Sequence, residues 1–186
     1  QALNPDDSIQ SGWWANKYGI QLGWHAFGLF GYEGLESRLE YNRVRPFTYA
    51  HSSADQSYSH ANLALAHPLG ANFEEAVGIL NYHWKKWRLH LQYNYSRGGY
   101  SLPANNFGDN ILLSNNSRFR EYGNVLGQGQ AYSNQIVDIN ISYLIQSKWK
   151  LYAQIGYLNR KSKLIDTNQE NYLYLKLSTA LFNQYF

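Results

Sequence analysis

The chain has 186 residues, of which 44% are hydrophobic and 17% aromatic, and its formal net charge is +3. That charge is too small and too scattered to suggest a nucleic-acid partner, and the absence of Cys excludes disulfides and thiolate metal sites. The mean hydropathy of -0.53, together with the lack of any run of about 18 apolar residues, excludes a transmembrane helix.

Seven segments alternate between apolar and polar residues with the period of two that is typical of β-strands. They cover residues 17–27, 35–43, 75–84, 87–97, 134–145, 149–160 and 172–182. In the clearest of them, Trp87 and Leu89 begin an apolar face and Arg88 begins a polar one. The third segment has apolar residues on both faces, and we assign the side of Tyr82 and Trp84 to lipid.

Short and long connections alternate along the chain. The short ones are 28–34, 85–86 and 146–148, and the long ones are 44–74, 98–133 and 161–171. Outer-membrane β-barrels alternate short periplasmic turns with longer outer loops in this way. Aromatic residues gather at the short-turn ends, as they do at a membrane interface: Trp24, Phe27, Phe30, Trp84, Trp87, Trp149, Phe182, Tyr185 and Phe186.

The sequence therefore predicts an all-β fold, namely a portion of an antiparallel transmembrane β-barrel in the bacterial outer membrane, in contact with membrane lipid. A soluble β-sandwich or lipocalin-like barrel, which would bury the same apolar face in its own core, is the alternative. Residues 1–186 are assigned to one barrel domain. With short turns in the periplasm, Gln1 lies outside the cell and the C-terminus at Phe186 is periplasmic.

The odd number of strands carries a further expectation. Single-chain bacterial barrels usually have an even number of strands, and both ends of the chain lie in the periplasm. Seven strands that start outside the cell are therefore expected to be the C-terminal part of a larger barrel. Upstream strands or a partner chain would complete it, because an unpaired strand edge in lipid leaves backbone groups without hydrogen bonds.

Charged side chains occupy the polar faces of the predicted strands and would line the barrel lumen. They are Glu36, Arg38, Glu40, Arg88, His90, Asp138, Lys150, Arg160 and Lys176. Because both signs are present, we expect a hydrogen-bonded network that fills the barrel. A selective, porin-like channel is the alternative.

Three histidines lie in the first long connection, at His51, His60 and His67. Their spacing matches no compact metal-ligand motif, so no metal site is assigned. We expect the rings to hydrogen-bond the loop backbone and to stack with Tyr49 and Tyr58, and metal binding or direct ligand contact are the alternatives. No local nucleophile motif accompanies any histidine, so no catalytic residue, enzyme activity or cofactor is expected.

The second long connection is rich in Asn, Ser, Gly and aromatic residues. Amides and acids can hydrogen-bond sugar hydroxyls and aromatic rings can stack on pyranose faces, although any hydrated surface loop has a similar composition. The candidate ligand-binding side chains of the two long connections are Arg45, Tyr49, His60, His67, Asn72, Tyr100, Asn106, Asp109, Asn110, Arg118 and Tyr122.

Several runs in these connections resemble a known family. Residues 40–49, 58–60 and 65–73, with 109–113 and 120–124, are similar to Bacteroidetes outer-membrane proteins of the Wzi-type capsule-assembly and RemB-like gliding-motility class. The His-Pro-Leu-Gly-Ala-Asn run at 67–72 is the most specific part, and residues 61–64 are less typical. The resemblance covers about Trp24 to Phe186.

The resemblance implies the C-terminal part of a large barrel that binds or helps assemble surface polysaccharide, as Wzi-type lectins hold capsule on the cell. Its second implication is a structural or interaction subunit of a gliding-motility or secretion envelope complex, with other outer-membrane proteins as partners. No catalytic residues carry over from the family. An open pore is a third possibility for such a barrel.

Overall fold

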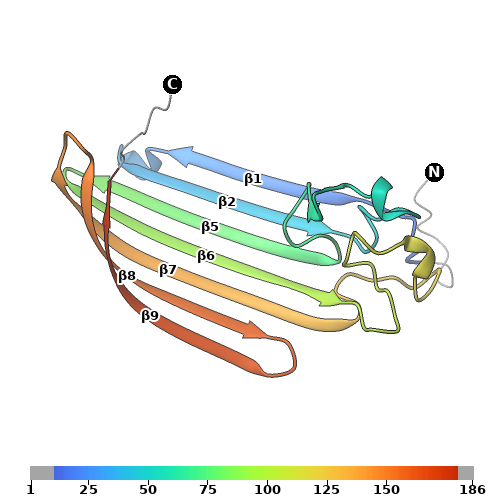
Figure 1. Ribbon diagram of the computed structural model, residues 1–186. Coiled ribbons are helices and arrows are strands. Elements are labelled where there is room, and N and C mark those ends of the chain that lie inside the picture. The colour runs from blue at the N-terminus through green and yellow to red at the C-terminus, as the bar shows by residue number, and fades with distance from the viewer. Residues whose placement is uncertain (1–10, 180–186) are drawn as a thin grey trace.

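The computed structural model describes residues 11–179 of the chain. Seven strands form one antiparallel sheet in the order β1-β2-β5-β6-β7-β8-β9, so each strand pairs with its neighbours along the chain (Figure 1). The strands are β1 (Gly19–Phe27), β2 (Leu35–Val44), β5 (Phe73–Trp84), β6 (Trp87–Tyr100), β7 (Gln130–Gln146), β8 (Leu151–Lys163) and β9 (Thr167–Ser178). The predicted all-β, antiparallel architecture is confirmed.

The remaining elements are short. Strands β3 (Ser59–His60) and β4 (Leu63–Ala64) pair as a separate hairpin, and the 3-10 turns are η1 (Leu29–Gly31), η2 (Ala54–Gln56) and η3 (Asn115–Ser117). Over residues 11–179, no helix is long and apolar enough to cross a membrane.

Each predicted segment overlaps an observed strand, but most predicted bounds were wrong by a few residues, and two of the differences change the interpretation. The predicted long connection 161–171 is a tight hairpin, because the β8–β9 pairing continues to Lys163 and Thr167. Its polar residues suggested a loop, yet they belong to strands that extend past the apolar part of the sheet. Trp149 and Lys150 lie in a turn before β8, so Lys150 is not in a strand as predicted. The predicted residues 180–182 lie outside the described part of the chain, as do Phe182, Tyr185 and both chain ends.

The strand register brings the apolar sides of all seven strands onto one face of the sheet, called here the apolar face. One row across it joins Leu80, Leu91, Ile139, Tyr157 and Leu173. Another row begins with Trp84 and Trp87, so the Trp84 side of β5 belongs to the apolar face. The opposite side, called the polar face, carries the alternate residues of every strand.

Exposure is inverted relative to a water-soluble sheet. On the apolar face Leu22, Leu173 and Leu175 are 63%, 83% and 84% exposed, whereas Asn42 and Ser96 on the polar face are only 4% and 7% exposed. A soluble protein buries its apolar side chains because that removes them from water. The apolar face of this sheet is therefore exposed, whereas part of its polar face is buried.

The hydrophobic core lies at one end of the sheet instead, where the two long connections pack together (Figure 1). It contains Val44, Ala71, Phe73 and Ile111. Phe47 is fully buried beside it, and its backbone N–H donates to the Gly108 carbonyl at 2.8 Å. We call residues 45–72 and 101–129 together the cap.

Candidate binding site at the cap end of the sheet

The cap is held together by buried polar side chains. Asn72 is fully buried, and its Nδ2 donates to the Gly99 and Gln128 carbonyls at 2.8 Å each, while its Oδ1 accepts from the Gly127 N–H at 2.7 Å. It thereby joins the β2–β5 connection to both ends of the β6–β7 connection. The side chain that was predicted to contact a ligand is occupied by these structural hydrogen bonds.

Two other predicted ligand residues, Asn106 and Asp109, also make hydrogen bonds within the cap. Asn106 is buried and donates to the Ser114 carbonyl and to the Ser117 hydroxyl, both at 3.0 Å. Asp109 accepts from the backbone N–H of Ser101 at 2.8 Å and also from its hydroxyl. These contacts fix the loop backbone, and we expect them to leave these two side chains little capacity for a ligand.

Two predicted ligand residues near the cap surface, Asn110 and Arg118, differ in how much of their hydrogen-bonding capacity the cap uses: Arg118 donates through all three of its side-chain nitrogens to Glu121 and to the Asn115 carbonyl. Asn110 is exposed, and its Oδ1 accepts only the Leu112 N–H at 2.9 Å. Arg118 pairs with Glu121, and its guanidinium lies 4.5 Å from the Trp14 ring centroid. The segment before β1 is bound to the cap in the same region, because the Trp14 N–H donates to the Glu121 carbonyl at 2.9 Å.

Aromatic residues of the predicted set lie at the surface. Tyr100 is 42% exposed and stacks on Tyr132 with ring centroids 4.3 Å apart, and Tyr122 is 41% exposed. Tyr49 is half-buried with its ring centroid 6.0 Å from that of Tyr58, and burial raises the pKa of the Tyr49 hydroxyl above its usual range. Tyr100 and Tyr122 are the rings that a sugar could reach.

The histidine prediction holds in part. His67 bonds the loop backbone, because its Nδ1 accepts from the Leu69 N–H at 3.2 Å, but its ring stacks on Phe73 at 4.5 Å and not on Tyr49 or Tyr58. Its Nε2 lies 3.0 Å from Glu75 Oε2. His51 and His60 are exposed. Among the described residues, no three His, Asp or Glu side chains are grouped so that they could hold a metal ion.

The polar face carries the predicted charge network. The strand register puts all but one of the predicted lumen residues on it: Glu36, Arg38, Glu40, Arg88, His90, Asp138, Arg160 and Lys176. Lys150 is the exception, because it lies in the turn before β8.

Hydrogen bonds connect this face across strands. His25 contacts Glu36 at 2.9 Å, Asn81 contacts Glu36 at 3.5 Å, and His90 Nδ1 lies 2.7 Å from Asn81. Glu40 accepts from Arg38 at 2.6 Å. Farther along, the Tyr174 hydroxyl donates to Asp138 at 2.9 Å. Glu36, Arg38, Glu40, His90 and Asp138 thus make hydrogen bonds on this face, whereas Arg88 lies over the Tyr152 ring; a network that fills a barrel stays a prediction.

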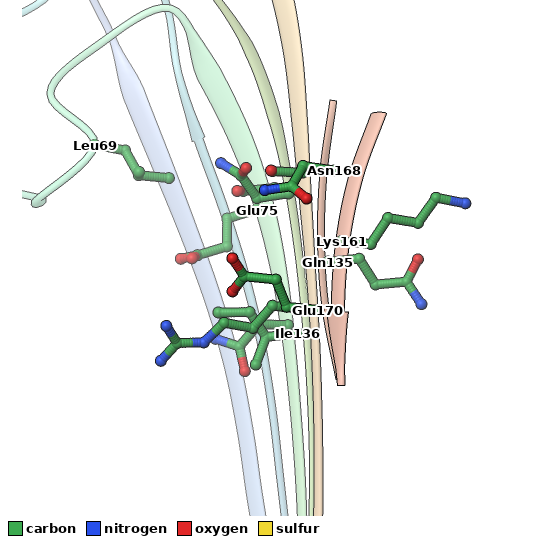
Figure 2. Close-up of a pocket in the computed structure, with 12 residues that line it drawn as sticks. Leu69, Glu75, Gln135, Ile136, Lys161, Asn168 and Glu170 are labelled. Atoms are coloured by element: carbon green, nitrogen blue, oxygen red, sulfur yellow. The ribbon is translucent and has the colours of Figure 1, made fainter. Parts of the chain in front are cut away.

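A groove of about 340 Å³ lies on the polar face directly below the cap (Figure 2). Two neighbouring rows of side chains line it across β5 to β9. The first row is Glu75, Ser96, Asn134, Ser162 and Asn168, and the second includes Asn94, Ile136, Arg160 and Glu170. Figure 2 shows Glu75 and Glu170 on the side of the sheet that faces Leu69, whereas Lys161 and Gln135 point away.

The groove is lined mainly by side chains that can hydrogen-bond. Hydroxyls and amides of four strands stand between the carboxylates of Glu75 and Glu170, with Arg160 beside Glu170 in the β8–β9 register. Such groups donate and accept several hydrogen bonds each. His67 connects the groove to the cap, because it contacts the Glu75 carboxylate.

Most of these groove residues were missed by the sequence analysis. Only Arg160 was singled out, as a lumen charge. The other side chains come from separate strands, and they meet only through the register. The available signal was that each occupies a polar-face position near the cap end of its strand.

Comparison of the chain with protein-family models, with curated proteins and with solved structures gives no match.

Proposed function

We propose that this sheet is part of a transmembrane β-barrel in the bacterial outer membrane and that its cap end, on the outside, binds surface polysaccharide. The observation that carries the membrane part is the inverted exposure of the sheet. Its apolar face would meet lipid and its polar face a wet lumen, as in outer-membrane barrels. The cap would lie outside, and the tight turns at 85–86 and 147–150 would lie in the periplasm.

The extent of the apolar face suits a membrane. On β6 it runs from Trp87 to Tyr95, which is roughly 26 Å along the strand at about 3.3 Å per residue. A tilted strand needs about 9 to 11 residues to cross hydrocarbon. Beyond Tyr95 the same side of the sheet becomes polar, with Arg97 and then Lys163 in one row. These residues would lie at the level of the lipid headgroups.

The groove below the cap supports the polysaccharide part of the proposal. Its hydroxyls, amides and charges can hydrogen-bond sugar hydroxyls, and the exposed rings of Tyr100 and Tyr122 offer stacking surfaces at the same end. The resemblance to Wzi-type capsule-assembly proteins points to the same ligand class. No chemistry beyond binding is needed.

The binding test compares the two faces of the same strands. We expect Asn134→Ala with Asn168→Ala, in the groove, to lower the affinity of the full-length protein for capsular polysaccharide from its host by about tenfold, which corresponds to about 1.4 kcal/mol. The matched control is Gln135→Ala with Gln169→Ala, which removes two amides from the opposite face of the same two strands, and it should leave affinity unchanged.

Four outcomes would contradict the proposal. Equal loss in both double variants would show that the groove does not bind the glycan. Absence of glycan binding with co-purification of other envelope proteins would favour a structural subunit of a motility or secretion complex. Ion conductance across planar bilayers without glycan binding would favour a channel. Recovery of the protein in a soluble fraction would refute the membrane part itself.

A further inference from the structure

A second pocket, of about 260 Å³, lies on the apolar-face side of the sheet where β1 and β2 meet the cap. Tyr18, Arg43, Arg45 and Asn124 are among its lining residues. Arg43 pairs with Ile20 in the β1–β2 register, so it continues the column of Leu39 and Tyr41 on that face. The pocket therefore stands directly beyond the edge of the apolar surface.

The two arginines have unused hydrogen-bonding capacity. Nε of Arg43 and Nε of Arg45 are buried, and the described residues provide no hydrogen-bond partner for either nitrogen. Arg45 uses one Nη to donate to the Asn124 carbonyl at 3.1 Å. A buried donor without a partner is costly, so two such donors at one pocket indicate that an acceptor belongs there.

The local charge favours an anion. The neighbouring carboxylate, Glu74, is paired with Arg97 and accepts from the Tyr41 hydroxyl at 2.9 Å. Arg43 and Arg97 lie opposite Glu74 on either side, and Arg45 adds a further positive charge to the same pocket, which leaves an excess of positive charge at Arg43 and Arg45. Guanidinium groups bind phosphate through paired, charge-assisted hydrogen bonds.

A separate apolar groove of about 430 Å³ lies farther along β1 and β2 on the same side of the sheet. Its floor is Gly78 and Ala76, and its sides include Leu22, Trp24, Leu39 and Tyr93. Leu39 is four residues from Arg43 on β2, which is roughly 13 Å along the strand. A cationic pocket and an apolar groove thus lie a few residues apart along the same strand.

We propose that these two features form one binding site for a phosphate-bearing lipid of the outer leaflet. The phosphate accepts hydrogen bonds from Arg43 and Arg45, and an acyl chain lies over Gly78. Adjacency of a cationic head pocket and an apolar groove on one face matches the charge and shape of such a lipid, whereas an acidic glycan has no use for the groove. The inference rests on the proposed membrane position of the apolar face.

The test measures lipid binding to the full-length protein in detergent, with bis-phosphorylated lipid A and its dephosphorylated form as probes. Loss of each arginine should weaken phosphorylated lipid A about tenfold, since a charge-assisted hydrogen bond contributes on the order of the free energy that one factor of ten represents. Arg43→Gln and Arg45→Gln remove the head contacts. Gly78→Val fills the groove and should also weaken binding.

Lys163→Gln is the matched control. Lys163 lies in the same cross-strand row as Arg43, and the substitution removes one positive charge from β8 and not from the pocket. It should bind like the unchanged protein. Equal affinity for the two lipid forms, or equal effects of Arg43→Gln and Lys163→Gln, would overturn the proposal. Competition by inorganic phosphate, with no effect of Gly78→Val, would identify a free-anion site and also overturn it. A protein that is extracted from the membrane fraction and still binds glycan could give any of these results, so failure of the lipid site is distinct from failure of the proposed function.

Discussion

Replacing Asn72 by alanine should open the cap without unfolding the sheet. The side chain makes three hydrogen bonds to backbone groups of the β6–β7 connection and its flanking strand. At about 1 kcal/mol each, their loss costs about 3 kcal/mol. Asn72 also has φ of 61°, a left-handed conformation that costs alanine roughly another 1 kcal/mol. The expected total is about 4 kcal/mol.

Hydrogen exchange of the Phe47 amide provides the assay. This N–H donates to the Gly108 carbonyl within the cap and makes no contact with Asn72 itself, so it reports opening of the cap as a unit. A loss of about 4 kcal/mol corresponds to an exchange rate roughly a thousandfold faster. Amides in the centre of the sheet should keep their protection.

Two variants separate the contributions. Asn72→Gly relieves the backbone strain but loses the same hydrogen bonds, so its effect should be about 1 kcal/mol smaller. Asn110→Ala removes one exposed Asn side chain that bonds only a neighbouring turn, and it should cost under about 1 kcal/mol. If the Phe47 amide exchanges equally fast in Asn72→Ala and Asn110→Ala, the hydrogen bonds of Asn72 do not hold the cap together and the prediction is refuted.

Three further predictions concern the two faces of the sheet and the cap. Leu175→Lys places a charge on the apolar face, where a lipid-facing lysine costs about 2 to 4 kcal/mol. Denaturant titration of folding into bilayers measures this cost. If Leu175→Lys costs as little as Lys176→Gln on the polar face, membrane contact of the apolar face is contradicted. Gly156→Ala would put a Cβ 2.3 Å from the Tyr174 ring, so it should cost about 1 to 3 kcal/mol, and Tyr174→Ala should suppress that cost in a double-mutant cycle. His67→Ala removes a stacking contact and a hydrogen bond to the β5 carboxylate; it should raise exchange in residues 64–72 about tenfold through a loss of about 1.4 kcal/mol, and unchanged exchange there would contradict the link between groove and cap.

The sheet could be predicted from the sequence because a period of two is a local signal. Alternation in β6 already separates the Trp87 side from the Arg88 side, and the register then extends each face across all strands. The β8–β9 hairpin was missed for the opposite reason. Residues such as Lys161 and Gln169 pair in the ladder but are polar on both faces, so no alternation marks them as strand.

The interior of the cap could not be predicted, because polar composition does not distinguish a hydrated loop from a packed one. Asn72, Asn106 and Gln128 were expected at a surface or left unassigned, yet all three are buried. Each satisfies backbone groups that would otherwise be buried without hydrogen bonds, which is a requirement of packing loops together. The partners of Asn72 lie 27 and 56 residues away, so no short window of sequence contains them.

The direction of the edge strands constrains how the sheet is completed. Within the described residues β1 and β9 are the edges, and because the sheet is antiparallel with seven strands, they run in the same direction. A neighbour that pairs antiparallel with either must run the opposite way, so in the proposed barrel an odd number of further strands would separate β9 from β1. Two copies of this sheet related by rotation about the barrel axis would instead place β9 beside β1 in parallel. Because the chain has no Cys, cysteines at Leu22 and Leu175, which both lie on the apolar face of an edge strand, provide a clean test. We expect no disulfide between these positions within or between chains, and efficient cross-linking would show a parallel seam and refute all-antiparallel closure.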